Sequence, residues 1–387
     1  MLKNRHISFL TWLLSGMMLL MTGACSSSDE EGQESGADKK PVMLAIYVYA
    51  PEQAAAAQKK AAQTRGDVGD VDAITAAEGE IKSLKIWIYE SVSGDSVRYF
   101  ETKDVAALNQ GQGTTYQIPV SDDFAKNKPK VDVYVLANVT HDNCGVGSLD
   151  KNTERDDLMT KAKIVESKFG LSPLTTEVPT DGLPMAGKLT TQPVVGDAPA
   201  LRVGTLSAVS TVQLTRAVSK LRFVFAKTTG QPTVRITSIK INENMIPDVE
   251  YLFDKPESAP TITYNTEAGE LSSPIDDIAE TADPTDYIYF NQDAQEYENL
   301  INGANLTVNG PIYLRESDKQ LAGTITYTIN GGSEQTVDFA MQQAGDFSRN
   351  HTWIVYAYYA GSGKLQVQTV YVKDWSTKEI SHNVYNW

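Results

Sequence analysis

The sequence is poor in cysteine, with only Cys25 and Cys144 among 387 residues. A disulfide framework needs several cysteine pairs, so disulfides do not hold this fold together. Histidine is also scarce, with four residues, and those beyond His6 lack metal-ligand spacing. Neither a His-Glu-x-x-His nor a Gly-x-Ser-x-Gly motif occurs. We therefore expect a protein that is not an enzyme and that binds no metal or cofactor.

Positive charge is in deficit: 34 lysines and arginines face 49 aspartates and glutamates, for a net charge of -15. Phosphate backbones are bound by clustered lysine and arginine, so the balance argues against nucleic acid as a partner. The hydrophobic fraction of 41% is sufficient for real cores. With a prior of roughly 150 residues per domain, the length allows two domains after an export signal.

The N-terminus has the pattern of a bacterial lipoprotein signal. Basic Lys3 and Arg5 precede an apolar stretch over residues 7–24, and Cys25 follows directly. A thiol at the first mature position can carry a diacylglyceryl group, which anchors an exported protein to a membrane. We predict a signal peptide over 1–24 and lipidation of Cys25. A plain signal peptide with an incidental cysteine, or a membrane-spanning helix, are the alternatives.

A short apolar strand follows an acidic, serine-rich tether over residues 26–40. Val42, Leu44, Ile46 and Val48 would share one face of this strand, and the residues between them the other face. Because both sets are largely apolar, we predict a strand over 42–49 that is buried on both faces. The next segment, 53–65, is rich in alanine, glutamine and lysine and is expected to be an exposed linker or short helix.

The rest of the chain is typical of an all-β protein, with short Val-, Ile-, Tyr- and Thr-rich segments between turn residues. An amphipathic helix is expected only over 156–169. A segment rich in proline, glycine and small residues near 191–210 suggests a domain boundary. The predicted divisions are a signal over 1–24, a lipidated tether with strand and linker over 25–65, an N-terminal β-sandwich over 66–205 and a C-terminal β-sandwich over 206–387. We predict strands over 82–89, 97–100, 131–137, 212–214, 221–225, 234–241, 287–290, 324–329, 352–359 and 365–372.

Six segments stand out in order behind the lipoprotein signal. They are Asp132-Val133-Tyr134-Val135-Leu136-Ala137-Asn138, Leu183-Pro184-Met185-Ala186-Gly187, Thr215-Arg216-Ala217-Val218-Ser219-Lys220-Leu221, Ile312-Tyr313-Leu314-Arg315-Glu316-Ser317, Arg349-Asn350-His351-Thr352-Trp353 and Val372-Lys373-Asp374-Trp375 with the final Trp387. Each is weak alone, but together they resemble the fimbrillin family of Bacteroidetes-type fimbriae. One departure is Ser317, which stands where the family has asparagine.

The resemblance implies two transthyretin-like β-sandwich domains in tandem and assembly by strand exchange after proteolysis. In such a family an arginine-specific protease cuts after an arginine and releases the lipidated segment with its first strand. In this sequence the cut is expected between Arg65 and Gly66, and the strand removed would be 42–49. A strand from another subunit would then fill the groove. In stalk subunits the donor is C-terminal, and the candidate residues here are Leu365, Val367, Thr369, Tyr371, Val384 and Trp387.

The main hypothesis is therefore a structural subunit of a cell-surface fimbria that supports adhesion or biofilm formation. Its partners would be other fimbrial subunits, the outer membrane through the lipid on Cys25, the protease, and a host or bacterial surface ligand. The precursor would be an outer-membrane lipoprotein, and the mature form extracellular. The alternative is a monomeric surface lipoprotein that binds glycans or host protein, for which grouped exposed aromatic residues would be the signature.

Overall fold

The protein is described by a computed structural model, which covers residues 40–50, 75–110, 113–165, 168–285, 288–291, 296–299, 307–341 and 343–374. Strands dominate these residues, which confirms the expected all-β class. The helices are short and connect strands. They are α2 (Ala76–Gly79), α3 (Asp122–Asn127), α4 (His141–Cys144), α5 (Arg155–Lys161) and the 3-10 helix η1 (Leu108–Gln110).

Two five-stranded sheets, here called the first sheet pair, enclose one apolar core. Alternate side chains of both sheets point into that core, as in a β-sandwich. One sheet contains β1 (Val42–Tyr49), β4 (Thr114–Val120), β8 (Val194–Asp197), β9 (Ala200–Val203) and β10 (Thr211–Gln213). The other has the order β11 (Thr215–Arg216), β7 (Met185–Gln192), β5 (Val131–Ala137), β2 (Leu84–Glu90) and β3 (Ser96–Thr102).

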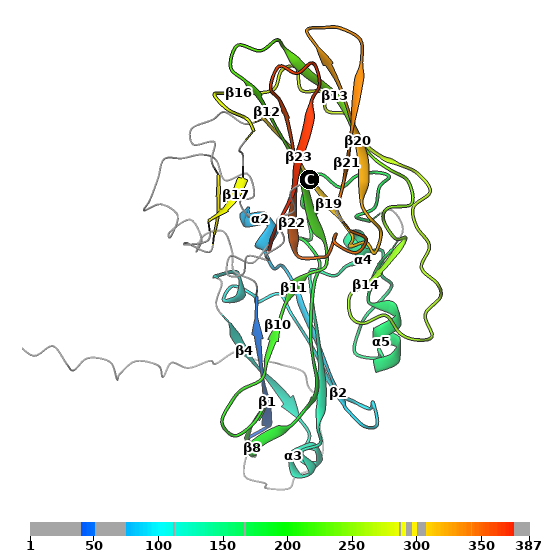
Figure 1. Cartoon of the computed structure of the whole chain (residues 1–387). Helices are drawn as coiled ribbons and strands as arrows, with labels where there is room; N and C mark the ends of the chain where they lie inside the picture. Colours follow the sequence, from blue (N-terminus) through cyan, green and yellow to red (C-terminus); the bar gives the residue numbers. More distant parts are fainter. Residues whose placement is uncertain are drawn as a thin grey trace, which may run out of the picture. The chain divides into compact units, whose positions relative to one another are not determined.

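The second sheet pair encloses a separate core that includes Phe223, Phe225, Ile325 and Val355. Figure 1 shows the neighbouring strands β12 (Ser219–Thr228), β22 (His351–Tyr359) and β23 (Gln366–Asp374) of one of its sheets. One sheet contains β16 (Glu280–Thr281), β12 (Ser219–Thr228), β22 (His351–Tyr359), β23 (Gln366–Asp374) and β19 (Thr307–Leu314), and the other contains β15 (Gly269–Leu271), β13 (Val234–Ile241), β20 (Ala322–Ile329) and β21 (Gln335–Ala340). The domain boundary after residue 205 stays a prediction; β10 and β11 pair within the first sheet pair.

Two small sheets complete the described strands: β6 (Lys163–Val165) with β14 (Val249–Tyr251), and β17 (Ile288–Asn291) with β18 (Glu296–Asn299). The first of these corrects the expected helix over 156–169, because α5 ends at Lys161 and Ile164 lies in β6. Ile164 is buried, and its backbone pairs with Glu250 of β14. A distant strand partner therefore overrides the local helical pattern.

A buried carboxylate joins the first described turn after the 53–65 linker to the second sheet pair. Glu78 of α2 is fully buried, and both Lys220 of β12 and Tyr313 of β19 contact it. The Lys220 ammonium lies 3.2 Å from the carboxylate, and the Tyr313 hydroxyl donates to it at 2.6 Å. Burial, and next the Glu78 carboxylate, raise the pKa of Tyr313 far above its usual range. Such a buried charge is stable only because it is paired and hydrogen-bonded.

The backbone around Glu78 is held as firmly as its side chain. The Arg216 guanidinium donates to the Glu78 carbonyl at 3.0 Å, and Thr75 forms a capping box with Glu78. Slightly further along, the Asn138 side chain accepts from the Lys82 amide at 2.7 Å and donates to the Glu80 carbonyl at 2.7 Å. The segment 75–82 is therefore the place where three of the six family-like segments, those containing residue 138, residues 216 and 220, and residue 313, meet.

A second charged cluster lies between β14 and the loops after β19 and before β22. Glu250 is buried, and the Arg349 guanidinium, 3.3 Å away, is shared with Glu316. The Glu316 amide donates to the Glu250 carboxylate at 2.9 Å. Burial outweighs the attraction of Arg349 and raises the pKa of Glu250 to about 8. The folded protein therefore favours the protonated, neutral form of the Glu250 carboxyl.

We expect Glu78→Gln to lower the free energy of unfolding by about 3–5 kcal/mol, since the Lys220 ammonium then stays buried without this carboxylate. Urea denaturation measures the change. The matched control is Glu80→Gln, which removes only a solvent-exposed contact of 3.4 Å to Lys82 and should change the free energy by less than about 0.5 kcal/mol. Equal effects of the two substitutions would contradict the buried pairing.

Glu250 predicts a pH-dependent stability. The pKa of the Glu250 carboxyl is about 8 in the folded protein, whereas its ordinary value, which applies to the unfolded chain, is 4.5. Between these two pH values the folded state therefore binds more protons than the unfolded state. The free energy of unfolding must then fall as pH rises through this window, by up to about 1.4 kcal/mol per pH unit. Glu250→Gln should flatten that slope in urea titrations, whereas Glu243→Gln, at an exposed site, should not. An unchanged slope in Glu250→Gln would refute the assignment.

Candidate functional site

The predicted first strand, β1, lies inside a sheet, and Figure 1 shows it beside β4 and β10. Along one edge it pairs antiparallel with β4, from Val42 opposite Val120 to Val48 opposite Thr114. Along the other edge it runs parallel to β9 at its beginning and to β10 at its end. Both edges of β1 are therefore hydrogen-bonded, as expected for a strand that fills a central, pairable position.

The inward face of β1 fills the core of the first sheet pair. Val42, Leu44, Ile46 and Val48 are 6%, 0%, 1% and 0% exposed. They pack in one cluster with side chains from both sheets. Full burial of one such side chain contributes about 1.5–3 kcal/mol, so this strand supplies a large share of the local core.

The outward face of β1 corrects the expectation of burial on both sides. Met43, Ala45, Tyr47 and Tyr49 are only half-buried. The β4 residues opposite the first three of them, at positions 119, 117 and 115, are exposed. The apolar character of Met43 and the tyrosines misled the prediction, since both residue types tolerate a partly wet surface.

β10, one of the strands that flank β1, is placed with the help of a glycine in one of the family-like segments. A Cβ atom at Gly187 of β7 would lie 2.9 Å from Cγ1 of Val212 and closer still to the Gln213 carbonyl oxygen. Only a glycine lets β7 approach β10 this closely. Gly187 therefore helps to place the strand that pairs with Tyr47, Val48 and Tyr49.

The strand along the other edge of β1, β4, was not predicted from the sequence. β4 carries the alternating pattern of a half-buried strand, with Tyr116 and Ile118 inward. Pro119 argues against a strand assignment there, but proline is tolerated on edge strands. Among the described strands, β4 pairs only with β1, so Pro119 disrupts no ladder. Burial, with a smaller contribution from Asp104, raises the pKa of Tyr116 to about 12.

The first part of the candidate donor region is a strand of the second sheet pair. β23 pairs antiparallel with β22, with Thr369 opposite Tyr356 and Tyr371 opposite Ile354. Leu365, just before β23, is 2% exposed, and Val367 packs against the same core. Val384 and Trp387 lie outside the described residues, so a donor role for the tail remains a prediction.

The remaining predicted processing sites also lie outside the described residues. These are the lipidation site Cys25 and the cleavage pair Arg65 and Gly66, together with the 53–65 linker. Cys144 is described and is fully buried, and burial raises the pKa of its thiol far above the usual range. A buried thiol of this kind is typical of a structural cysteine.

The described residues offer neither a metal-binding cluster nor a membrane-spanning helix. Within the described ranges, no group of three or more His, Cys, Asp or Glu side chains is arranged to hold a metal ion. None of the helices described is long and apolar enough to cross a membrane.

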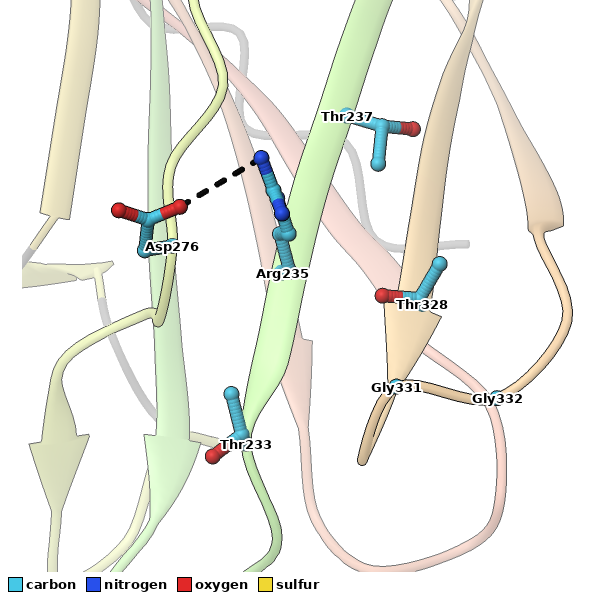
Figure 2. A pocket seen from close by; sticks show the side chains of 7 residues that line it. All are labelled: Thr233, Arg235, Thr237, Asp276, Thr328, Gly331 and Gly332. Atoms are coloured by element: carbon cyan, nitrogen blue, oxygen red, sulfur yellow. Dashed lines mark ion pairs between the residues drawn. The ribbon is translucent and has the colours of Figure 1, made fainter.

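A shallow groove on β13 and β20 is lined by hydroxyl groups, two glycines and one ion pair (Figure 2). Arg235 lies 3.5 Å from Asp276 across it, and both side chains are largely exposed. Among the described residues that line this groove, none is aromatic. The lining residues are Thr233, Arg235, Thr237, Asp276, Thr328, Gly331 and Gly332.

Solved structures of bacterial fimbrial proteins show similarity at low identity. The tip fimbrial protein Mfa3 from Porphyromonas gingivalis, with a C-terminal truncation, is 14% identical over 86% of this chain and 99% of its own, with a TM-score of 0.46. A fimbrial assembly protein from Parabacteroides distasonis is 12% identical over 90% and 100%, with a TM-score of 0.41. The fimbrial anchor protein Mfa2 from Porphyromonas gingivalis is 10% identical over 86% and 98%, with a TM-score of 0.37.

The sequence model of one protein family matches this chain, and no curated protein does. The family is described as major fimbrial subunit protein (FimA), and the match runs over residues 44–216. That range begins within β1 and ends with β11, so it spans the groove strands β1, β4, β9 and β10. Over residues 44–216, the chain is therefore similar to the fimbrillin family of fimbrial subunits.

Proposed function

We propose that this chain is a structural subunit of a cell-surface fimbria, that it polymerises by protease-triggered strand exchange, and that it supports adhesion and biofilm formation. The observation that carries the proposal is the place of β1, which is inserted between strands on both edges and ends before the linker with the predicted cut. Removal of the N-terminal segment that contains β1 would therefore remove one complete strand from the sheet.

Loss of β1 would uncover apolar surface and unpaired backbone together. Four fully or nearly fully buried side chains would leave the core, and the edges of β4, β9 and β10 would lose their ladder partner. Open strand edges of this kind recruit another strand. Strand complementation from a neighbouring chain restores the backbone hydrogen bonds and fills the side-chain pockets.

The segment that follows the cut would stay in place. Glu78 and its contacts to Lys220 and Tyr313 fix α2 to the second sheet pair, ten or more residues beyond Arg65. Cleavage after Arg65 would therefore release the part carrying Cys25 and β1, and leave the body of the subunit intact. Lipid on Cys25 would hold the precursor at the outer membrane until that step.

Arg65→Gln tests the processing step. We expect this variant to remain lipidated and monomeric, because the segment with β1 is then never released. Sheared filaments of the unaltered protein should give Gly66 as the first residue in N-terminal sequencing. Arg98→Gln, at an exposed arginine of β3, is the matched control and should assemble normally. Filament subunits that begin at Cys25 would show that the cut does not occur.

Deletion of residues 376–387 tests the donor tail. We expect trimmed subunits without this tail to stay monomeric in size-exclusion chromatography, since the groove of the next subunit receives no strand. Full-length subunits cut in parallel should give a ladder of oligomers, and Ser381→Ala should behave like them. Normal ladders from the truncated chain would assign the donor to another segment.

A further inference from the structure

The outward face of β1 contains one contact that the strand-exchange proposal does not use. Tyr47 is half-buried although Thr115, which faces it on β4, and Thr211, which faces it on β10, are both exposed. What covers its ring is Gly113, the residue before β4 begins. A Cβ atom at position 113 would lie 2.8 Å from Cε2 of Tyr47 and closer still to Cζ and the hydroxyl oxygen.

The geometry is that of a diagonal cross-strand pair. Thr115 is directly opposite Tyr47, so Gly113 is two positions along β4 on the same face. Side chains in this relation are close enough for an aromatic ring to reach across. Because glycine has no side chain, the Tyr47 ring lies directly on the Gly113 backbone and shields it from water. This contact surface on Gly113 is here called the ring seat. This matches the way aromatic residues compensate for glycine in edge strands, and β4 pairs with no described strand other than β1.

The two outward residues earlier in β1, Met43 and Ala45, have no glycine at the corresponding diagonal position. The residue diagonal to Met43 is Gln117 and the residue diagonal to Ala45 is Thr115, and both carry exposed side chains. Within the described part of β4 and its entry, residues 113–120, Gly113 is the single glycine. The position of Tyr47 is therefore distinguished from its neighbours by the strand beside it.

We infer that Gly113 selects the incoming strand of a second subunit for an aromatic residue on the outward face, at the position that Tyr47 occupies in the precursor. The inference rests on the proposed strand exchange. The preferred strand is apolar at alternate positions and carries an aromatic residue between the third and fourth of them. Many apolar strands can fill the inward pockets. An aromatic residue of the incoming strand contacts Gly113 only when that strand is aligned in one register.

The direction of the incoming strand is constrained by the same surroundings. β1 is antiparallel to β4 and parallel to β9 and β10. A strand that enters in this direction places its sixth residue against Gly113, whereas a reversed strand places its third residue there. The candidate donor tail has Tyr385 directly after Val384, as Tyr47 follows Ile46, but in this register His382 and Asn386 stand at the places of Leu44 and Val48.

The experiment cuts the full chain at Arg65 in the presence of excess labelled peptide with the sequence of residues 42–49, flanked by lysines for solubility. Retained peptide is measured after size-exclusion chromatography. The Tyr47→Ala peptide should bind about fivefold more weakly, as expected for loss of one strong cross-strand aromatic contact. The Met43→Ala peptide is the matched control and should bind within about twofold of the original.

The receiving chain supplies the reciprocal test. In Gly113→Ala the new methyl group occupies the ring seat, so the preference for tyrosine over alanine in the peptide should disappear. Equal binding of both peptides to the unaltered chain, or an unchanged preference in Gly113→Ala, would overturn the inference. If no peptide is retained by any chain, the proposed strand exchange itself fails, and the contact is then judged in the uncut protein.

In the uncut protein, Tyr47→Ala should raise the unfolding equilibrium constant about fivefold when residue 113 is glycine and have little effect in Gly113→Ala. Additive effects of the two substitutions in urea denaturation would show that the ring seat does not exist. This arm requires no strand exchange, so it separates the inference from the function on which it rests.

Discussion

The buried carboxylate of Glu78 is the constraint on which the rest of the arrangement depends. A carboxylate at 0% exposure is tolerable only with partners, and its partners come from β12 and β19, far along the chain. Because α2 is the first described element after the linker, this pairing fixes the position of residues 76–79 against β12 and β19. The hydrogen bonds of Arg216 and Asn138 extend the same attachment to the backbone of residues 78–82.

β1 is attached in a different way. Its inward contacts are apolar and its edge contacts are backbone hydrogen bonds, which any strand of suitable pattern can reproduce. The attachment of α2 depends on particular charges and donors, and no generic segment replaces it. An element held by generic apolar and backbone contacts and an element held by particular side chains therefore lie on either side of the 53–65 linker in the sequence. This contrast is the physical basis for expecting a cut in the linker to change the partner of the groove while the body persists.

Sequence reasoning recovered the strands whose apolar residues alternate or run together, such as β1, β5 and β13. It missed β4, a half-buried strand that contains Pro119, and it extended a helix through Ile164, which pairs with β14 instead. Glu78 could not have been singled out, since its two side-chain partners lie 142 and 235 residues away. Likewise Gly113 resembles any loop glycine until the register of β1 against β4 is known.

The two edges of the groove also bear on how subunits would be ordered. One edge is antiparallel and continuous along seven residue pairs, whereas the other is parallel and divided between β9 and β10. Reversing a strand in this position would exchange the hydrogen-bond geometry of both edges at once. An incoming strand is therefore not equivalent in its two directions. A contact with one allowed direction, made between different surfaces of successive subunits, is heterologous, and heterologous contacts that do not close a ring continue as a filament.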